Sequence, residues 1–340
     1  MSQDIVIAGW GAVSPAGWTA ESLADVALSR VPLPYSEECR GEGAPIRRFR
    51  SVPAWSEIPQ WARHARLRRS SPVARYAVSA ALSALGDLQV ERETIGVIFV
   101  TMNGCVGFSR RFFSEVLANP ALASPILFPE TVFNAPSSHL SSLLMSPTVN
   151  YTILGDSAQF LGGLDLAAQW LDEGRVEHCL VIASEEMDWL SNEALGLFPG
   201  NRIAADGAAA VYLRKGNPSD GVILEEITPP VLMSSSVNRA EAAHKMRQSP
   251  CFVPHLNERT LICDSRCGSA IWDAPEVNLW HDLSASIHSP SQWLGDAASV
   301  NAGWQTVLGC ELLKRQEADA AIISAVGCSE QAVAAVLRRV

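Results

Sequence analysis

The chain has 340 residues, of which 48% are hydrophobic and 18% are charged, and its formal net charge at neutral pH is −10. This size favours a large buried core of about two ordinary domains, and no run of about 18 apolar residues predicts a membrane span. An acidic chain is also poorly suited to nucleic acid, because phosphate contacts require a basic face.

Strand-like and helix-like segments alternate from the start of the chain. The opening MSQDIVIAGWG lacks a basic region, so it predicts a first strand at residues 5–8 and not a signal peptide. Helical spacing follows at 20–30. Ser71 is a good N-cap and Pro72 suits a first turn, so a helix is expected from there to Leu85.

The alternation continues with strands expected at 95–100, 149–154 and 179–183, and with a helix expected at about 157–173. Such alternation is typical of a mainly parallel sheet covered by helices. The closest pair among the eight cysteines is Cys263 and Cys267, and no second pair completes a zinc site. We therefore expect reduced thiols in a cytoplasmic protein, with no metal and no cofactor.

A basic cluster interrupts the acidic chain in the segment WARHARLRRSSP. The cluster consists of four arginines, Arg63, Arg66, Arg68 and Arg69. One interpretation is a solvated helix end. The other is a docking site for an acidic partner, because clustered positive charge attracts a negative surface.

An internal repeat relates two parts of the chain. LGDSA at 154–158 and LGDAA at 294–298 each precede a helical segment that ends in a charged turn and enters an apolar strand. We therefore predict two related halves, residues 1–215 and 216–340, in one compact unit. The matching aspartates, Asp156 and Asp296, suggest a structural helix cap in each half.

Five stretches resemble the ketoacyl-acyl-carrier-protein synthases of the thiolase superfamily. They are IVIAGWGAVSPAG, FPETVFNAPSSHLSSLL, LDLAAQWLDEGRVEHCLVIASEE, ADGAAAVYLRK and LGDAASVNAGWQTVLGCELLK. The resemblance extends over nearly the whole chain, with the five stretches in the family's order. The chain is shorter than typical family members, mostly after residue 215. The resemblance implies a thiolase-like α/β fold, in which two halves with mainly parallel, five-stranded-type sheets are sandwiched by helices.

The resemblance also identifies where catalytic residues would stand. A family member uses a cysteine at a strand-to-helix turn, where the helix N-terminus favours the thiolate, and two histidines. Ser157 takes the cysteine position here, Ser265 in TLICDSRCGSAIWDAPE takes the first histidine position, and Gln292 takes the second. We therefore expect a scaffold that has lost its chemistry.

These substitutions favour a non-catalytic, ketosynthase-like subunit resembling the chain-length factors of type II polyketide and aryl-polyene systems. Its implied partners are an active ketosynthase, which it joins as a heterodimer, and an acyl carrier protein that docks at the basic cluster. Tyr151 belongs to the strand that the resemblance places at the dimer interface. Candidate tunnel or interface residues are Phe112, Phe113, Phe128, Thr131 and Phe133. The alternative for these aromatic residues is ordinary core packing.

Two enzymatic alternatives remain open. Ser157 lies in a strand-to-helix turn, as nucleophiles of acyltransferases and hydrolases do, with His139 or His288 as its candidate base. A decarboxylase that supplies starter units is the other alternative. Relatives of that kind keep both histidines, so Ser265 and Gln292 argue against it.

Overall fold

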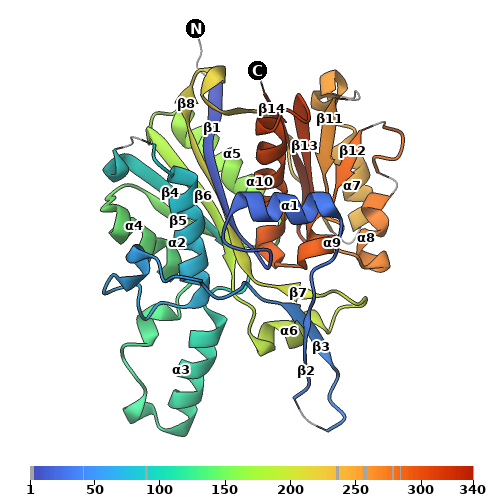
Figure 1. Cartoon of the computed structure of the whole chain (residues 1–340). Helices are drawn as coiled ribbons and strands as arrows, with labels where there is room; N and C mark the ends of the chain where they lie inside the picture. Colours follow the sequence, from blue (N-terminus) through green and yellow to red (C-terminus); the bar gives the residue numbers. More distant parts are fainter. Residues whose placement is uncertain are drawn as a thin grey trace.

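Most strands of the chain join in one large mixed sheet (Figure 1). The computed structural model describes residues 4–339 except 41, 89–90, 235–236, 256–258, 278 and 284. In this part of the chain the sheet has eleven strands, in the order β12-β11-β13-β14-β9-β1-β8-β6-β4-β5, with β10 (Val231–Leu232) beside β14.

The sheet consists of two halves with the same pairing pattern. The first half contains β5 (Asn150–Leu154), β4 (Ile95–Thr101), β6 (His178–Glu185), β8 (Gly207–Gly216) and β1 (Asp4–Val13). The second contains β12 (Ser286–His288), β11 (Thr260–Cys263), β13 (Ala320–Val326), β14 (Gln331–Arg338) and β9 (Val222–Ile227). In each half the outer three strands are parallel and the inner pairings are antiparallel, and β1 joins β9.

This topology confirms the predicted thiolase-like fold of two related halves, with one refinement. The expected parallel pairing is confined to the outer three strands of each half. One inner antiparallel pairing follows directly from a short connection: β13 ends at Val326 and β14 begins at Gln331. A connection of this length forms a hairpin, whereas parallel neighbours need a long crossover.

Helices form three layers around the two half-sheets. The central layer contains α5 (Ala158–Asp172) and α10 (Asn301–Lys314), which pack between the half-sheets. The outer face of the first half is covered by α2 (Pro72–Leu85) and α4 (Ala135–Leu144). The second half is covered by α7 (Arg239–Arg247), with α8 (Ala270–Val277) beside it.

Local sequence explains how these helices begin and pack. Pro72 opens α2, and the Ser71 hydroxyl accepts the N–H of Ala74, so the predicted cap is confirmed. Gly303 lets α10 approach the sheet closely, because a Cβ atom there would lie 2.6 Å from the Cβ of Ala209. The short helices α1 (Ala20–Ser29) and α9 (Pro290–Leu294) lie near α10.

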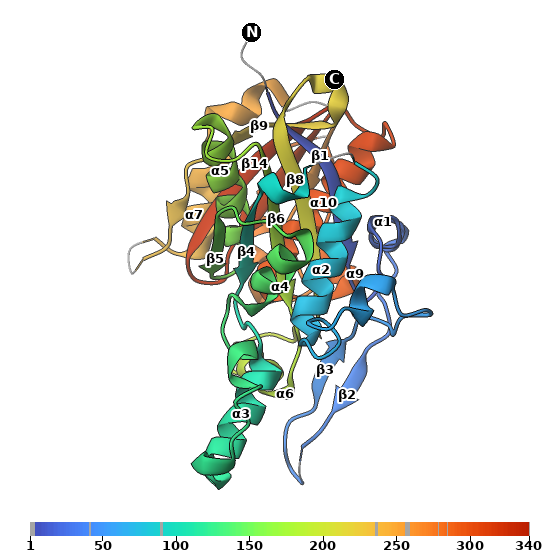
Figure 2. The ribbon, with the colours of Figure 1, turned by 90° about the vertical axis from the view of Figure 1, so that its left-hand side faces the viewer.

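Two segments project from the same end of the molecule (Figures 1 and 2). One is α3 (Val106–Ala118), which has no buried residue. The other is the hairpin of β2 (Ser36–Glu38) and β3 (Arg47–Arg50), whose second strand pairs with β7 (Ala204–Ala205). Between them lies α6 (Trp189–Leu195). No described helix combines the length and the apolar character that a bilayer crossing requires.

Candidate functional site

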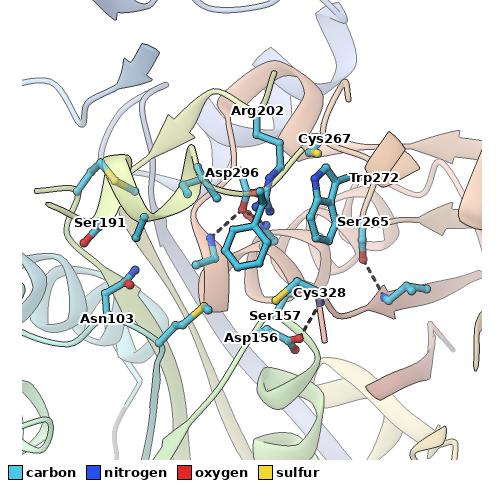
Figure 3. Close-up of a pocket in the computed structure, with 18 of the residues that line it drawn as sticks. Asn103, Asp156, Ser157, Ser191, Arg202, Ser265, Cys267, Trp272, Asp296 and Cys328 are labelled. Atoms are coloured by element: carbon cyan, nitrogen blue, oxygen red, sulfur yellow. Dashed lines mark hydrogen bonds and ion pairs between the residues drawn. The ribbon is translucent and has the colours of Figure 1, made fainter. Parts of the chain in front are cut away.

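The parallel strands of both halves end at one cavity, which has a volume of about 120 Å³. Asn103 follows β4, Ser157 follows β5, Ser265 follows β11 and Cys328 follows β13, and all four line this cavity (Figure 3). Ligands of open α/β sheets bind beyond the carboxyl ends of the strands. The cavity therefore occupies the place where this architecture puts a site.

Ser157 lies at the N-terminus of α5, is only 7% exposed and lines the cavity. Its hydroxyl has no hydrogen-bond partner among the described residues. The same holds for the buried hydroxyl of Ser191, which also lines the cavity. The preceding carboxylate of Asp156 accepts main-chain N–H groups from Ala158 at 3.1 Å, Cys328 at 2.7 Å and Ser329 at 3.3 Å. Asp156 therefore ties the start of α5 to the loop after β13.

Asp296 has the same role in the second half. Its carboxylate accepts the N–H of Ala298 at 3.0 Å, as Asp156 accepts that of Ala158. It also accepts the Asn301 side-chain amide at 2.9 Å and forms an ion pair with Arg202 at 2.8 Å. The structural role predicted for both aspartates is confirmed, but neither is the N-cap itself. Each lies one residue before the N-cap, which is Ser157 for α5 and Ala297 for the 3₁₀-helix Ala298–Val300, and fixes the turn there.

Ser265 is held entirely by structural hydrogen bonds. Its hydroxyl donates to the Ser324 carbonyl at 3.1 Å (Figure 3 shows its place in the wall). It accepts the N–H of Val326 at 3.1 Å and the side-chain amide of Gln305 at 3.2 Å. A hydroxyl has one hydrogen to donate and two lone pairs. All three are engaged, so Ser265 has no capacity left for a reacting group.

Gln292 lies on α9 and is not among the residues that line the cavity. The chain turns at the end of α9, where Gly295 has a φ of 104°. The N–H of Asp296 then donates to the Ile203 carbonyl at 2.8 Å. This turn directs Asp296 to the cavity wall. The repeated LGD motif singles out Asp296 in the sequence. We interpret it there as a helix cap, and its place in the cavity wall is not predicted by the sequence.

None of the histidines in the described part of the chain lines the cavity. His139 is paired with Glu130 at 2.8 Å on another surface. His288 is bonded to the Ser286 hydroxyl at 2.9 Å, and burial lowers its pKa to about 4, so it is neutral at pH 7. The structure therefore does not bring Ser157 together with either candidate base.

The cavity has a wall of arginine and aromatic side chains that the sequence did not indicate. The guanidinium of Arg202 lies 4.2 Å from the ring centroid of Trp272, and that of Arg239 lies 4.6 Å from it. The indole N–H of Trp272 donates to the Pro199 carbonyl at 2.6 Å. These residues come from distant segments, so no local motif marks them.

Two cysteines also line the cavity, and neither is an activated nucleophile. Burial raises the pKa of the Cys267 thiol far above its ordinary value. Burial likewise raises the pKa of Cys328 to about 11, with Asp156 adding to the effect. Both remain protonated thiols at neutral pH, whereas the thiolate is the reactive form. The described residues hold no group of His, Cys, Asp and Glu that fits a metal ion.

A second candidate site is the apolar face formed by β5, α3 and the segment between α3 and α4. Phe113 is 62% exposed, Phe128 57% and Phe133 44%, so core packing does not account for these three predicted interface residues. Phe112 is partly exposed and its ring lies 5.6 Å from that of Phe128, while the Thr131 hydroxyl donates to the Phe128 carbonyl.

The edge of the sheet belongs to the same face. β5 is the last strand and pairs only with β4 among the described strands. Tyr151 is 53% exposed and Leu154 50%. An edge strand with free backbone groups and apolar side chains is a template for pairing with another chain. We call this edge together with α3, Phe128 and Phe133 the apolar face.

The basic cluster is exposed on the turn before α2. Its arginines, Arg63, Arg66, Arg68 and Arg69, have no ion-pair partner in the described part of the chain. Arg66 lines a shallow groove together with Glu130 and His139. The cluster is therefore available to an external anionic group.

Solved ketosynthase structures share this fold over nearly the whole chain. The ishigamide ketosynthase/chain length factor matches with a TM-score of 0.84 at 16% identity, over 99% of both chains. A type II polyketide synthase ketosynthase, solved with its acyl-carrier protein and bound to the hexaketide, matches with a TM-score of 0.79 at 15% identity, over 100% of both chains.

A ketosynthase in complex with its chain length factor from Xenorhabdus doucetiae matches with a TM-score of 0.77 at 13% identity, over 99% of this chain and 98% of that chain. No protein-family model and no curated protein matches the sequence. The chain has the thiolase-like fold of the ketosynthases.

Proposed function

We propose that this chain is a non-catalytic subunit of the chain-length-factor type, which pairs with an active ketosynthase and shapes its acyl or polyene tunnel. The pathway class would be fatty-acid-like or polyketide biosynthesis. The chain's fold is similar to structures described as a ketosynthase/chain length factor and as a ketosynthase with its chain length factor.

The observation that carries the pairing is the apolar face. Large apolar side chains are normally buried, and a contiguous exposed group of them marks an interaction surface. Here such side chains lie on an open sheet edge and on a projecting helix without buried residues. A stable partner would cover both, in an interface on the order of 2,000 Å² or more in total.

The cavity chemistry supports a role without condensation. Ser157 has no histidine beside it, and the Ser265 hydroxyl is fully engaged. A serine hydroxyl without a base is a weak nucleophile, because its pKa lies far above neutral. Decarboxylation by a histidine pair is equally unsupported, since neither equivalent position carries one.

The basic cluster is proposed as a docking site for an acyl carrier protein. Its four arginines are exposed and lack ion-pair partners in the described residues, although the chain as a whole is acidic. Complementary charge increases the rate and specificity of association more than its final affinity.

The test is co-expression of the tagged chain with the ketosynthase encoded nearest to it. We expect a stable one-to-one complex by sedimentation, and product formation only when both subunits are present. The isolated chain should release no carbon dioxide from malonyl carrier protein. A monomer that ignores the ketosynthase would contradict the proposal, and an acyl group found on Ser157 by mass spectrometry would favour the acyltransferase alternative.

A further inference from the structure

We propose that the cavity between the two halves binds a small aliphatic monocarboxylate, with Arg239 as its cationic partner. This ligand site goes beyond the partner-subunit function and does not depend on it. It uses residues of this chain alone, none of which belongs to the apolar face.

The charges that line the cavity leave one cation without a carboxylate. Arg202 is paired with Asp296, and Asp156 is satisfied by three main-chain N–H groups. Arg239 donates only to carbonyl oxygens, those of Gly327 at 2.9 Å, Trp272 at 3.0 Å and Val326 at 3.4 Å.

A guanidinium carries five N–H groups, so two N–H groups of Arg239 remain without a partner in the described residues. Burial lowers the pKa of Arg239, and the carboxyl of Glu276 acts in the opposite direction. Burial raises the pKa of Glu276 itself well above its ordinary value, and Glu276 does not line the cavity. A buried charge is stabilised by pairing. A carboxylate ligand would supply both the missing charge and the missing acceptors.

The cavity lining offers further polar groups. The Ser157 hydroxyl faces the cavity without a hydrogen-bond partner among the described residues, although the residue is more than nine-tenths buried. The Ser191 hydroxyl, which also lines the cavity, is likewise buried without a partner in the described part of the chain. Trp272, Met102 and Leu195 add apolar lining. The cavity thus provides an unpaired cation, two hydroxyls and apolar surface, which match a carboxylate with a short hydrocarbon body.

The cavity volume limits the ligand. About 120 Å³ is somewhat less than the roughly 150 Å³ of an engineered protein cavity that holds one benzene molecule. The ligand should therefore have about six non-hydrogen atoms. Isobutyrate has this size, and isobutyramide is an uncharged molecule of the same shape.

The experiment is calorimetric titration of the isolated full chain with isobutyrate and, separately, with isobutyramide. We expect saturable binding of isobutyrate with a Kd at least about tenfold lower than that of the amide, because only the carboxylate forms a charge-assisted pair. Equal affinities, or no saturable binding of isobutyrate, would overturn the proposal. This comparison needs no variant and so is unaffected by any folding defect.

Variants locate the site. Arg239→Met should weaken isobutyrate binding about tenfold and leave the weak amide binding unchanged. The matched control is Arg247→Met, because Arg247 also lies over an indole ring, 4.7 Å from that of Trp280, but outside the cavity. Loss of binding in both variants, or in neither, would place the ligand elsewhere. A chain that binds isobutyrate but no ketosynthase would refute only the partner-subunit function.

Discussion

Replacing Phe113 with serine should weaken pairing with the ketosynthase without destabilising the chain itself. Phe113 is 62% exposed on a helix with no buried residue. A phenylalanine side chain offers about 200 Å², so a partner covering the exposed part would bury about 120 Å² of apolar area. At about 25 cal/mol per Å² this contributes about 3 kcal/mol, or roughly a hundredfold in Kd.

The assay is the Kd of the complex by analytical ultracentrifugation, together with urea unfolding of the isolated chain. Unfolding should change by no more than about 0.5 kcal/mol, as for other surface substitutions. Val253→Ser is the matched control, because Val253 is 70% exposed on the second half of the chain and away from α3. An unchanged Kd for Phe113→Ser would refute the assignment of this face, as would an equal loss in the control.

Three further predictions concern chemistry, pH and docking. Ser157→Cys should give no condensing activity by itself, and Ser157→Ala should change product formation by the complex by less than about tenfold. Burial raises the pKa of Asp206 to about 6 from 3.8. Its contribution to stability is therefore present below pH 3.8 and is lost as pH rises through 6. Asp206→Asn should remove about 2 kcal/mol of this dependence between pH 4.5 and 7.5, measured by urea unfolding. Arg66→Glu combined with Arg69→Glu should weaken carrier-protein binding about tenfold at low salt, and high salt should abolish the difference.

The sequence predicts the repeated architecture well because the repeat is local. Each LGD motif lies next to its own helix, and each aspartate accepts the main-chain N–H two residues further along the chain. Such short-range hydrogen bonds are encoded by neighbouring residues. The order of strands and helices follows in the same way from hydrophobic periodicity.

The cavity wall could not be predicted because its members meet only in three dimensions. Arg202 follows α6, Arg239 opens α7 and Trp272 lies on α8, yet both guanidinium groups lie over the same ring. The residue pattern alone could not separate exposure from core packing at the apolar face, since the same residues in another fold would be core; only the family resemblance indicated an interface there. Gly295 also shifts the chain so that Asp296, and not Gln292, reaches the cavity.

Ser265, which the resemblance aligns with a catalytic histidine, is part of the structural framework, and this is why we predict that a single substitution would not create condensing activity. Besides its three hydroxyl bonds, Ser265 donates its main-chain N–H to the buried carboxyl of Glu276 at 3.4 Å, and that carboxyl also accepts the Ser324 hydroxyl at 3.0 Å. Burial raises the pKa of Glu276 well above its ordinary range. A histidine at position 265 would remove the three bonds of the Ser265 hydroxyl and leave the Ser324 carbonyl, the Val326 N–H and the Gln305 amide without it. Each buried polar group left unsatisfied costs about 1–3 kcal/mol. The network around Ser265 therefore opposes a histidine at this position.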